Sequence, residues 1–125
     1  METAQQKRIF LIEDYQPLAH FLKLQLEAEG YRVHAEAQGT PALKYALDHP
    51  ADFDLVILDL KLLDISGLEV CKQLRRITGA LPILMLTGLG EPIDQLRGIA
   101  HGADAYLKKP CETSLLLKTI DSLLS

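Results

Sequence analysis

The chain has 125 residues and a mass of 13.9 kDa, which fits a single domain. It carries 13 Lys and Arg against 17 Asp and Glu, and the net charge of −4 argues against a basic surface that binds nucleic acid. With 48% hydrophobic and 24% charged residues, it is not a disordered tail. The apolar run at 9–12 is too short for a signal peptide or a membrane span, and Cys71 and Cys111 match no zinc or redox spacing. We therefore expect a cytoplasmic protein that does not enter a membrane.

Short apolar runs alternate with longer amphipathic segments along the chain. The runs that predict strands are 9–12, 31–35, 55–58, 83–86 and 105–107. Runs that are apolar at every position, such as the first, third and fourth, are typical of parallel strands covered on both faces. The second run alternates with polar residues, so it predicts a strand at the edge of the sheet.

Each predicted strand is followed by a helix with a recognisable start. The residues that mark these starts are Pro17, Thr40 with Pro41, the capping box Ser66 with Glu69, Pro92, and Thr113 or Ser114. Gly102 can end the fourth helix in a left-handed turn. Five strand–helix units predict a parallel sheet with helices on both faces, and a (β/α)8 barrel is excluded because it needs about 250 residues. A Rossmann unit and an open flavodoxin-like sheet both fit this pattern, so it leaves the strand order open.

Chemically active side chains stand at the carboxyl ends of these strands, where open parallel sheets bind their ligands. The first strand is followed by Glu13 and Asp14 and the third by Asp59, while the fourth ends at Thr87 and the fifth leads to Lys109. Three carboxylates, a hydroxyl and an ammonium therefore converge on one edge of the sheet.

The three carboxylates repel one another unless something neutralises them. At about 5 Å and an effective dielectric constant of about 20, each pair costs roughly 3 kcal/mol. Glu13, Asp14, Asp59 and one lysine sum to −3 + 1 = −2, so one divalent cation would balance the site. Hard oxygen ligands favour Mg2+, and a carboxylate beside Mg2+, a lysine and a hydroxyl suits phosphoryl transfer.

In this order the residues resemble those of response-regulator receiver domains, over residues 8–124. The likeness is carried by Glu13-Asp14, Asp59, Gly67, Thr87-Gly88, Gly102-Ala103-Asp104 and Lys109-Pro110. Two positions depart from the family pattern, because Leu63 stands where proline is usual and Cys111 where phenylalanine is common. The resemblance implies one receiver domain over 1–125 without an effector domain. It also implies a flavodoxin-like (βα)5 fold with five parallel strands in the order 2-1-3-4-5.

The resemblance also implies a role for each site residue. Asp59 would accept a phosphoryl group from the phosphohistidine of a sensor histidine kinase or a histidine phosphotransfer protein. Glu13, Asp14, Asp59 and the backbone carbonyl of Lys61 would hold Mg2+. Lys109 would pair with the phosphoryl group. The chain would then be a phosphoacceptor with self-catalysed phosphotransfer and dephosphorylation, not a conventional enzyme.

The same resemblance implies how the signal leaves the site. Thr87 would donate its hydroxyl to the phosphoryl group and draw Tyr106 inward. This movement would change the face formed by the fourth helix, the fifth strand and the fifth helix. That face would then control a downstream protein partner, an output domain or a second copy in a homodimer. The flanking residues Lys61 and Leu89 would influence the lifetime of the acyl phosphate.

Two other functions compete with this interpretation. One is a pseudo-receiver that acts as a protein-binding adaptor and never takes phosphate. The other is an aspartate-nucleophile phosphatase, which usually needs a second acid two residues after its nucleophile, where this chain has Lys61. The other acids near Asp59 are Asp52, Asp54 and Asp64, and we interpret them as solvated loop residues.

Overall fold

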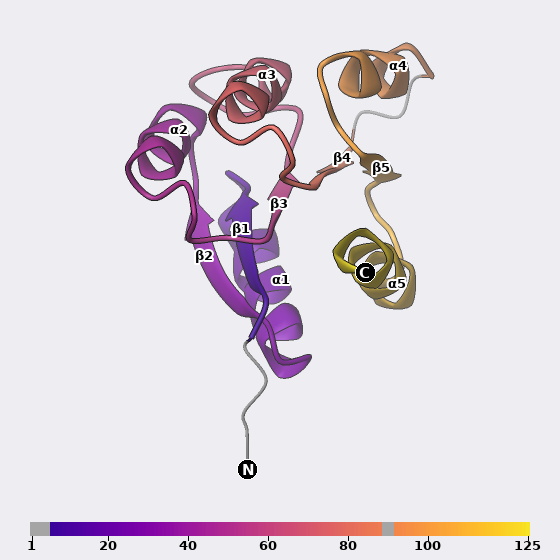
Figure 1. Ribbon diagram of the computed structural model, residues 1–125. Coiled ribbons are helices and arrows are strands. Elements are labelled where there is room, and N and C mark those ends of the chain that lie inside the picture. Colours follow the sequence, from indigo (N-terminus) through magenta and orange to yellow (C-terminus); the bar gives the residue numbers. More distant parts are fainter. Residues whose placement is uncertain (1–5, 89–91) are drawn as a thin grey trace.

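Strands and helices alternate throughout the computed structural model, which describes residues 6–88 and 92–125 (Figure 1). The strands are β1 (Arg8–Ile12), β2 (Arg32–Glu36), β3 (Leu55–Leu58), β4 (Ile83–Thr87) and β5 (Ala105–Lys108). The helices are α1 (Gln16–Ala28), α2 (Gly39–Asp48), α3 (Gly67–Ile77), α4 (Pro92–Ala100) and α5 (Thr113–Leu124). This confirms the predicted strand–helix repeat.

The strands form one five-stranded parallel sheet in the order β2-β1-β3-β4-β5. This is the flavodoxin-like order, and it confirms both the predicted fold class and the prediction that the second strand lies at an edge. In Figure 1, α2, α3 and α4 lie above the sheet, and α1 and α5 lie below it.

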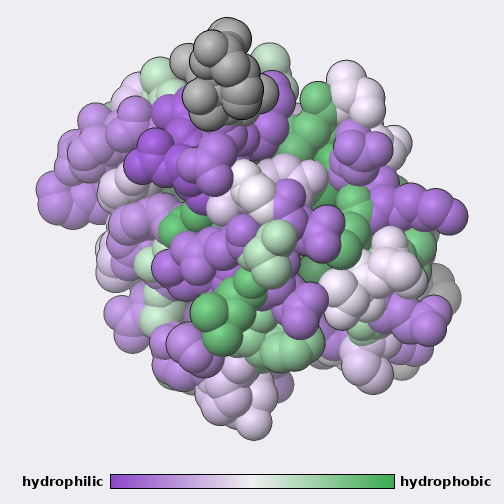
Figure 2. Space-filling view, turned by 90° about the horizontal axis from the view of Figure 1, so that it is seen from below, coloured by the Kyte–Doolittle hydropathy of each residue, from purple (hydrophilic) through white to green (hydrophobic). Residues whose placement is uncertain are grey.

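The three central strands, β1, β3 and β4, are buried on both faces over most of their length, which explains their apolar runs. Along β1, Phe10 and Ile12 pack into a cluster with α2 and α3, whereas Ile9 and Leu11 pack into a second cluster with α1 and α5. Alternate side chains of a strand point to opposite faces, so both sets must be apolar when helices cover both sides. On the side seen in Figure 2, the surface is mostly hydrophilic, with separate apolar patches.

The helix starts agree with the sequence in part. Ser66 caps α3, since its hydroxyl accepts a hydrogen bond from the Leu68 N–H at 3.1 Å. Gly102 follows α4 with φ of +109°, the left-handed conformation predicted for that helix end. At α2 the prediction was wrong, because the helix begins at Gly39 and its cap residue is not Thr40.

The cap of α2 comes from the loop between β3 and α3. The carboxylate of Asp64 accepts hydrogen bonds from the Gly39 N–H at 2.8 Å and the Thr40 N–H at 2.7 Å. These are N–H groups at the start of a helix, where a negative charge is also favourable. Asp64 is exposed in its loop, as predicted, but it also caps α2, a role that the sequence analysis did not predict.

Within the described ranges, no helix is long and apolar enough to cross a lipid bilayer.

Candidate functional site at the carboxyl edge of the sheet

A pocket of about 750 Å³ opens where β1, β3, β4 and β5 end. It is lined by Glu13, Asp14, Tyr15, Leu18, Asp59, Lys61, Leu62, Leu63, Thr87, Gly88, Lys109 and Pro110. The structure therefore brings together every predicted site residue except Tyr106. The parallel sheet explains this, because it places the carboxyl ends of all its strands at the same edge.

Lys109 connects two acids that come from different strands. Its ammonium nitrogen lies 2.6 Å from Oε1 of Glu13 and 3.2 Å from Oδ2 of Asp59. Glu13 is only 2% exposed and Asp59 only 6%, so water cannot fully solvate either carboxylate. Buried charges need a partner of this kind, and Lys109 supplies it.

Burial also shifts the proton affinities of this pair. The pKa of Glu13 is raised, chiefly because its carboxylate is desolvated, and the hydrogen bonds from Lys109 and Tyr15 offset this only in part. Desolvation alone would lower the pKa of Lys109. The hydrogen bond to Glu13 and the charge of Asp59 raise it instead, so the ammonium stays protonated. The site thus keeps one fixed positive charge among its carboxylates.

The remaining negative charge fits a metal ion. Glu13, Asp14 and Asp59 each offer one carboxylate oxygen, and these oxygens lie within 4.8 Å of one another. The backbone of Lys61 is held beside them, because its N–H donates a 3.1 Å hydrogen bond to Oδ1 of Asp59. An all-oxygen set with two nearly buried carboxylates suits a hard divalent cation.

Asp59 is held at the end of β3 by its neighbours in space. Its N–H donates to the carbonyl of Ile12 at 3.0 Å, which continues the pairing of β3 with β1. Behind it, Gly67 approaches so closely that a Cβ there would lie 2.1 Å from the carbonyl oxygen of Asp59. Only glycine fits at this position, and the Gly67 N–H also donates to the carbonyl of Leu60 at 2.7 Å.

Thr87 and Tyr106 occupy different environments. Thr87 is fully buried at the end of β4, and its carbonyl accepts a 2.8 Å hydrogen bond from the N–H of Lys109. Tyr106 is half-buried in β5, opposite Met85 of β4, and packs against the cluster under α2 and α3. Tyr106 therefore lies on a strand that ends at the pocket, but it does not line the pocket. Leu89 lies outside the described residues.

The pocket also uses a residue that the sequence analysis did not single out. The N–H of Tyr15 donates to Oε2 of Glu13 at 3.0 Å, while the Tyr15 side chain is 63% exposed. No motif marks this residue, although its place directly after the acidic pair and just before α1 was a usable signal. One carboxylate oxygen of Glu13 therefore accepts a hydrogen bond from the backbone just before α1, while the other accepts one from Lys109.

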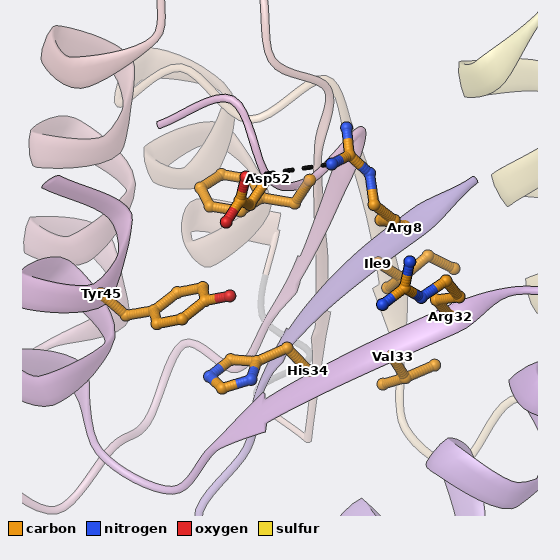
Figure 3. A pocket seen from close by; sticks show the side chains of 8 residues that line it. Arg8, Ile9, Arg32, Val33, His34, Tyr45 and Asp52 are labelled. Carbon is orange, nitrogen blue, oxygen red and sulfur yellow. Dashed lines mark ion pairs between the residues drawn. The ribbon is translucent and has the colours of Figure 1, made fainter. Parts of the chain in front are cut away.

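The acids that competed with Asp59 lie elsewhere. Asp54 accepts a 2.8 Å hydrogen bond from the Arg8 N–H, and Asp52 lies 4.0 Å from the guanidinium of the same arginine. Both acids lie at the amino ends of the strands. Asp54 is half-buried and hydrogen-bonded to Arg8, whereas the sequence analysis predicted a solvated loop acid. Figure 3 shows Asp52 and Arg8 in a second hollow at that end, together with Arg32, His34 and Tyr45.

Comparison with known proteins agrees with the observed fold. The family model "Response regulator receiver domain" matches residues 9–121. The response regulator ArlR of Staphylococcus saprophyticus is 40% identical over 117 residues, which is 94% of this chain and 52% of ArlR. ArlR of Staphylococcus epidermidis is 42% identical over 116 residues, again 52% of that protein. The chain thus spans about half the length of these curated relatives.

Solved structures give the same result. A CheY-like receiver domain protein from Methanospirillum hungatei superposes with a TM-score of 0.90 at 29% identity, covering 96% of this chain and 94% of that one. The chemotaxis protein CheY4 of Vibrio cholerae superposes with a TM-score of 0.88 at 31% identity, covering 96% of this chain and all of that one. Sequence, fold and site lead to one conclusion: the chain belongs to the response-regulator receiver domain family.

Proposed function

We propose that this receiver domain is a phosphorylation-dependent switch of a two-component phosphorelay, with Asp59 as its phosphoacceptor. The observation that carries this proposal is the position of Asp59. Its carboxylate is nearly buried, lies 3.2 Å from the Lys109 ammonium and belongs to the acidic cluster with Glu13 and Asp14. A carboxylate in this setting can act as a nucleophile while fixed positive charge stabilises the incoming phosphoryl group.

The transfer is an in-line displacement at phosphorus. An oxygen of Asp59 forms a new P–O bond as the P–N bond of the phosphohistidine breaks, and the imidazole of the donor leaves with the bonding electron pair. Lys109 and Thr87 line the same pocket, where the Lys109 ammonium would pair with the phosphoryl oxygens and the Thr87 hydroxyl would donate to one of them. Mg2+, held by Glu13, Asp14, Asp59 and the Lys61 carbonyl, would supply the charge that offsets those oxygens.

The phosphoryl group leaves by attack of water on the acyl phosphate, and the domain contributes little to this step. A phosphatase would place an acid two residues after its nucleophile, but that position is Lys61. We therefore propose a signalling phosphoacceptor with slow self-catalysed dephosphorylation in place of a conventional enzyme. Lys61 lines the pocket, where it can influence the access of water to the phosphoryl group.

We propose that output proceeds from Thr87 through Tyr106 to the face formed by α4, β5 and α5. We also propose that residues 1–125 form one receiver domain, whose phosphorylated face controls a downstream protein, an output domain or a second copy. Its donor is a sensor histidine kinase or a histidine phosphotransfer protein. The free thiols of Cys71 and Cys111 fit the reducing cytoplasm in which we place this relay.

Intact-protein mass after incubation with acetyl phosphate or phosphoramidate tests the phosphoacceptor. We expect a gain of one phosphoryl mass that requires Mg2+, is lost on treatment with hydroxylamine and is absent in Asp59→Asn. The matched control is Asp54→Asn, which changes an acid at the amino ends of the strands, away from the pocket. This variant should take phosphate normally. No gain with either donor would support the pseudo-receiver adaptor, and gain in Asp59→Asn at the normal rate would assign another acceptor.

A further inference from the structure

The outer edge of β2 forms one margin of the sheet. β2 is the last strand on its side of the sheet, and within residues 6–88 and 92–125 it pairs only with β1 (Figure 1). Arg32, His34 and Ala35 are exposed along it. An edge strand presents backbone donors and acceptors that can pair with another strand.

The hydrogen bonds to β1 show which backbone groups point outward. The Arg32 N–H donates to the Lys7 carbonyl at 3.0 Å, and the Glu36 carbonyl accepts from the Glu13 N–H at 3.1 Å. Arg32, His34 and Glu36 therefore direct their backbone groups toward β1. Because successive residues of a strand alternate, Val33 and Ala35 direct their N–H and C=O groups to the open edge.

The side chains along this edge carry charges in a particular order. Arg32, His34 and Glu36 share one face of the sheet, since they are in register with Arg8, Phe10 and Ile12. The face thus presents a positive residue, a histidine and a negative residue in sequence. In Figure 3, the His34 side chain is directed toward Tyr45, and Val33 points to the other side of the strand.

We propose that the open edge of β2 binds a second copy of this chain in antiparallel register, about a two-fold axis at His34. In this register Val33 lies opposite the partner's Ala35, and the two residues exchange both backbone hydrogen bonds. Arg32 lies opposite the partner's Glu36 at a position without backbone bonds, where Cα atoms approach to about 4.5 Å. The symmetry repeats both pairs, so each copy contributes one cation and one anion.

The charge order selects this partner and this register. A parallel arrangement in register would place Arg32 against the partner's Arg32, which is unfavourable. An antiparallel register centred on Val33 would place Arg32 against the partner's His34. A register centred on Ala35 would leave Arg32 beyond the partner's strand. Only the register centred on His34 pairs opposite charges at both ends and uses all the outward backbone groups of Val33 and Ala35.

The His34 side chain is held within its own chain, in the hollow that β2 and α2 line together. The His34 ring stacks on Tyr45 with a centroid separation of 3.9 Å, and Nε2 of His34 lies 3.0 Å from Oε2 of Glu36. These contacts direct the imidazole toward Tyr45 of α2. The proposed interface lies along β2, at the opposite margin of the sheet from β5, and it leaves the pocket at the carboxyl ends of the strands open. Dimerisation through β2 therefore does not require phosphorylation.

Sedimentation velocity of the unphosphorylated chain over a concentration series tests this surface. We expect a reversible monomer–dimer equilibrium. Arg32→Glu should raise its dissociation constant about tenfold or more, because like charges then face each other twice. Glu36→Arg should have a similar effect, and the double variant R32E/E36R should recover dimerisation because the ion pairs return in reverse order. Ala35→Pro should also weaken the dimer, since it removes an outward N–H that β1 does not use.

A control variant separates this edge from the α4–β5–α5 face. Ile99→Glu changes a residue of α4 that is 52% exposed, and it should leave the equilibrium unchanged. Far-UV circular dichroism should show that each variant is folded. A chain that stays monomeric at every concentration overturns the proposal. So does normal dimerisation of both single charge variants, or a folded double variant that fails to recover.

Discussion

The ammonium nitrogen of Lys109 lies 2.6 Å from Oε1 of Glu13, although the two residues are 96 positions apart in the chain. The contact joins the end of β1 to the residue that follows β5, across β3 and β4. It places a permanent positive charge beside Asp59, which lies 3.2 Å from the same nitrogen. The site is therefore partly neutralised by the chain itself, and a divalent cation has less charge left to balance.

Removing this ammonium should be costly. Lys109→Ala leaves Glu13 and Asp59 buried without their cation, and we expect a loss of about 1–3 kcal/mol in the free energy of unfolding at pH 7. The lower part of the range reflects the 21% exposure of the Lys109 side chain, which lets water replace part of the ammonium. Urea denaturation measures the change. The adjacent, exposed Lys108→Ala is the matched control, and an equal loss in both variants would contradict the prediction.

Stabilisation by Mg2+ should depend on pH. The pKa of Glu13 in the folded protein is raised above its ordinary value of 4.5 by burial, so the metal-free folded state binds this proton more tightly than the unfolded chain does. The stability that Glu13 contributes without metal is therefore greatest below pH 4.5 and is lost as pH rises through the raised pKa. Mg2+ replaces that proton, so its stabilising effect should grow over the same interval.

Thermal unfolding with and without MgCl2 between pH 4 and pH 8 measures this dependence. Asp14→Asn should remove most of the Mg2+ effect while it changes the metal-free melting temperature little, because Asp14 is only half-buried. A shift in melting temperature that is the same at every pH, or that persists in Asp14→Asn, would contradict the assignment of these ligands.

Gly67 should tolerate no side chain. A Cβ at this position would lie 2.1 Å from the Asp59 carbonyl oxygen and 2.6 Å from Cα of Leu60, both of which are backbone atoms. We expect Gly67→Ala to destabilise the fold by about 1–3 kcal/mol or more and to slow phosphorylation, because the loop that carries Lys61 must move. Gly79→Ala is the matched control, since a Cβ there meets no atom within 4 Å. Normal stability and phosphorylation of Gly67→Ala would show that the loop adapts.

Asp64 should contribute to stability in a pH-dependent way. Burial acts to raise its pKa, but hydrogen bonds from the backbone of Thr40 and Gly39 lower it to about 2, below its ordinary value of 3.8. The contribution of a carboxyl with a lowered pKa is fully present above pH 3.8 and is lost as pH falls through about 2.

Asp64→Ala should therefore cost about 1 kcal/mol at pH 7, as the loss of a helix cap does. Denaturant unfolding of the variant and the wild type from pH 7 to pH 2 tests this, and the two curves should converge at the acid end. Asp52→Ala removes an exposed acid outside the α2 cap and should have a smaller effect. A cost for Asp64→Ala that does not change with pH would mean that it arises from packing.

The repeat of strands and helices could be read from the sequence because its cause is local. Strands covered on both faces must be apolar at each position, as along β1 and β3, and the acids that follow them stand at chain positions where the apolar runs stop. Once the strands are parallel, Glu13, Asp14 and Asp59 necessarily meet at one edge. The family likeness then indicated the strand order, which the apolar pattern alone left open.

Other relationships depend on the path of loops and the register of strands, which no local pattern encodes. Asp64 caps a helix that begins 25 residues earlier, and nothing in the residues around Thr40 indicates that its cap comes from elsewhere. Likewise, the sequence shows that Arg32 and Glu36 are two charged residues of one short strand. Only the pairing of that strand with β1 shows which of its backbone groups face outward. Periodicity determines which face of an element is buried, but contacts between distant segments are decided only when the chain closes on itself in three dimensions.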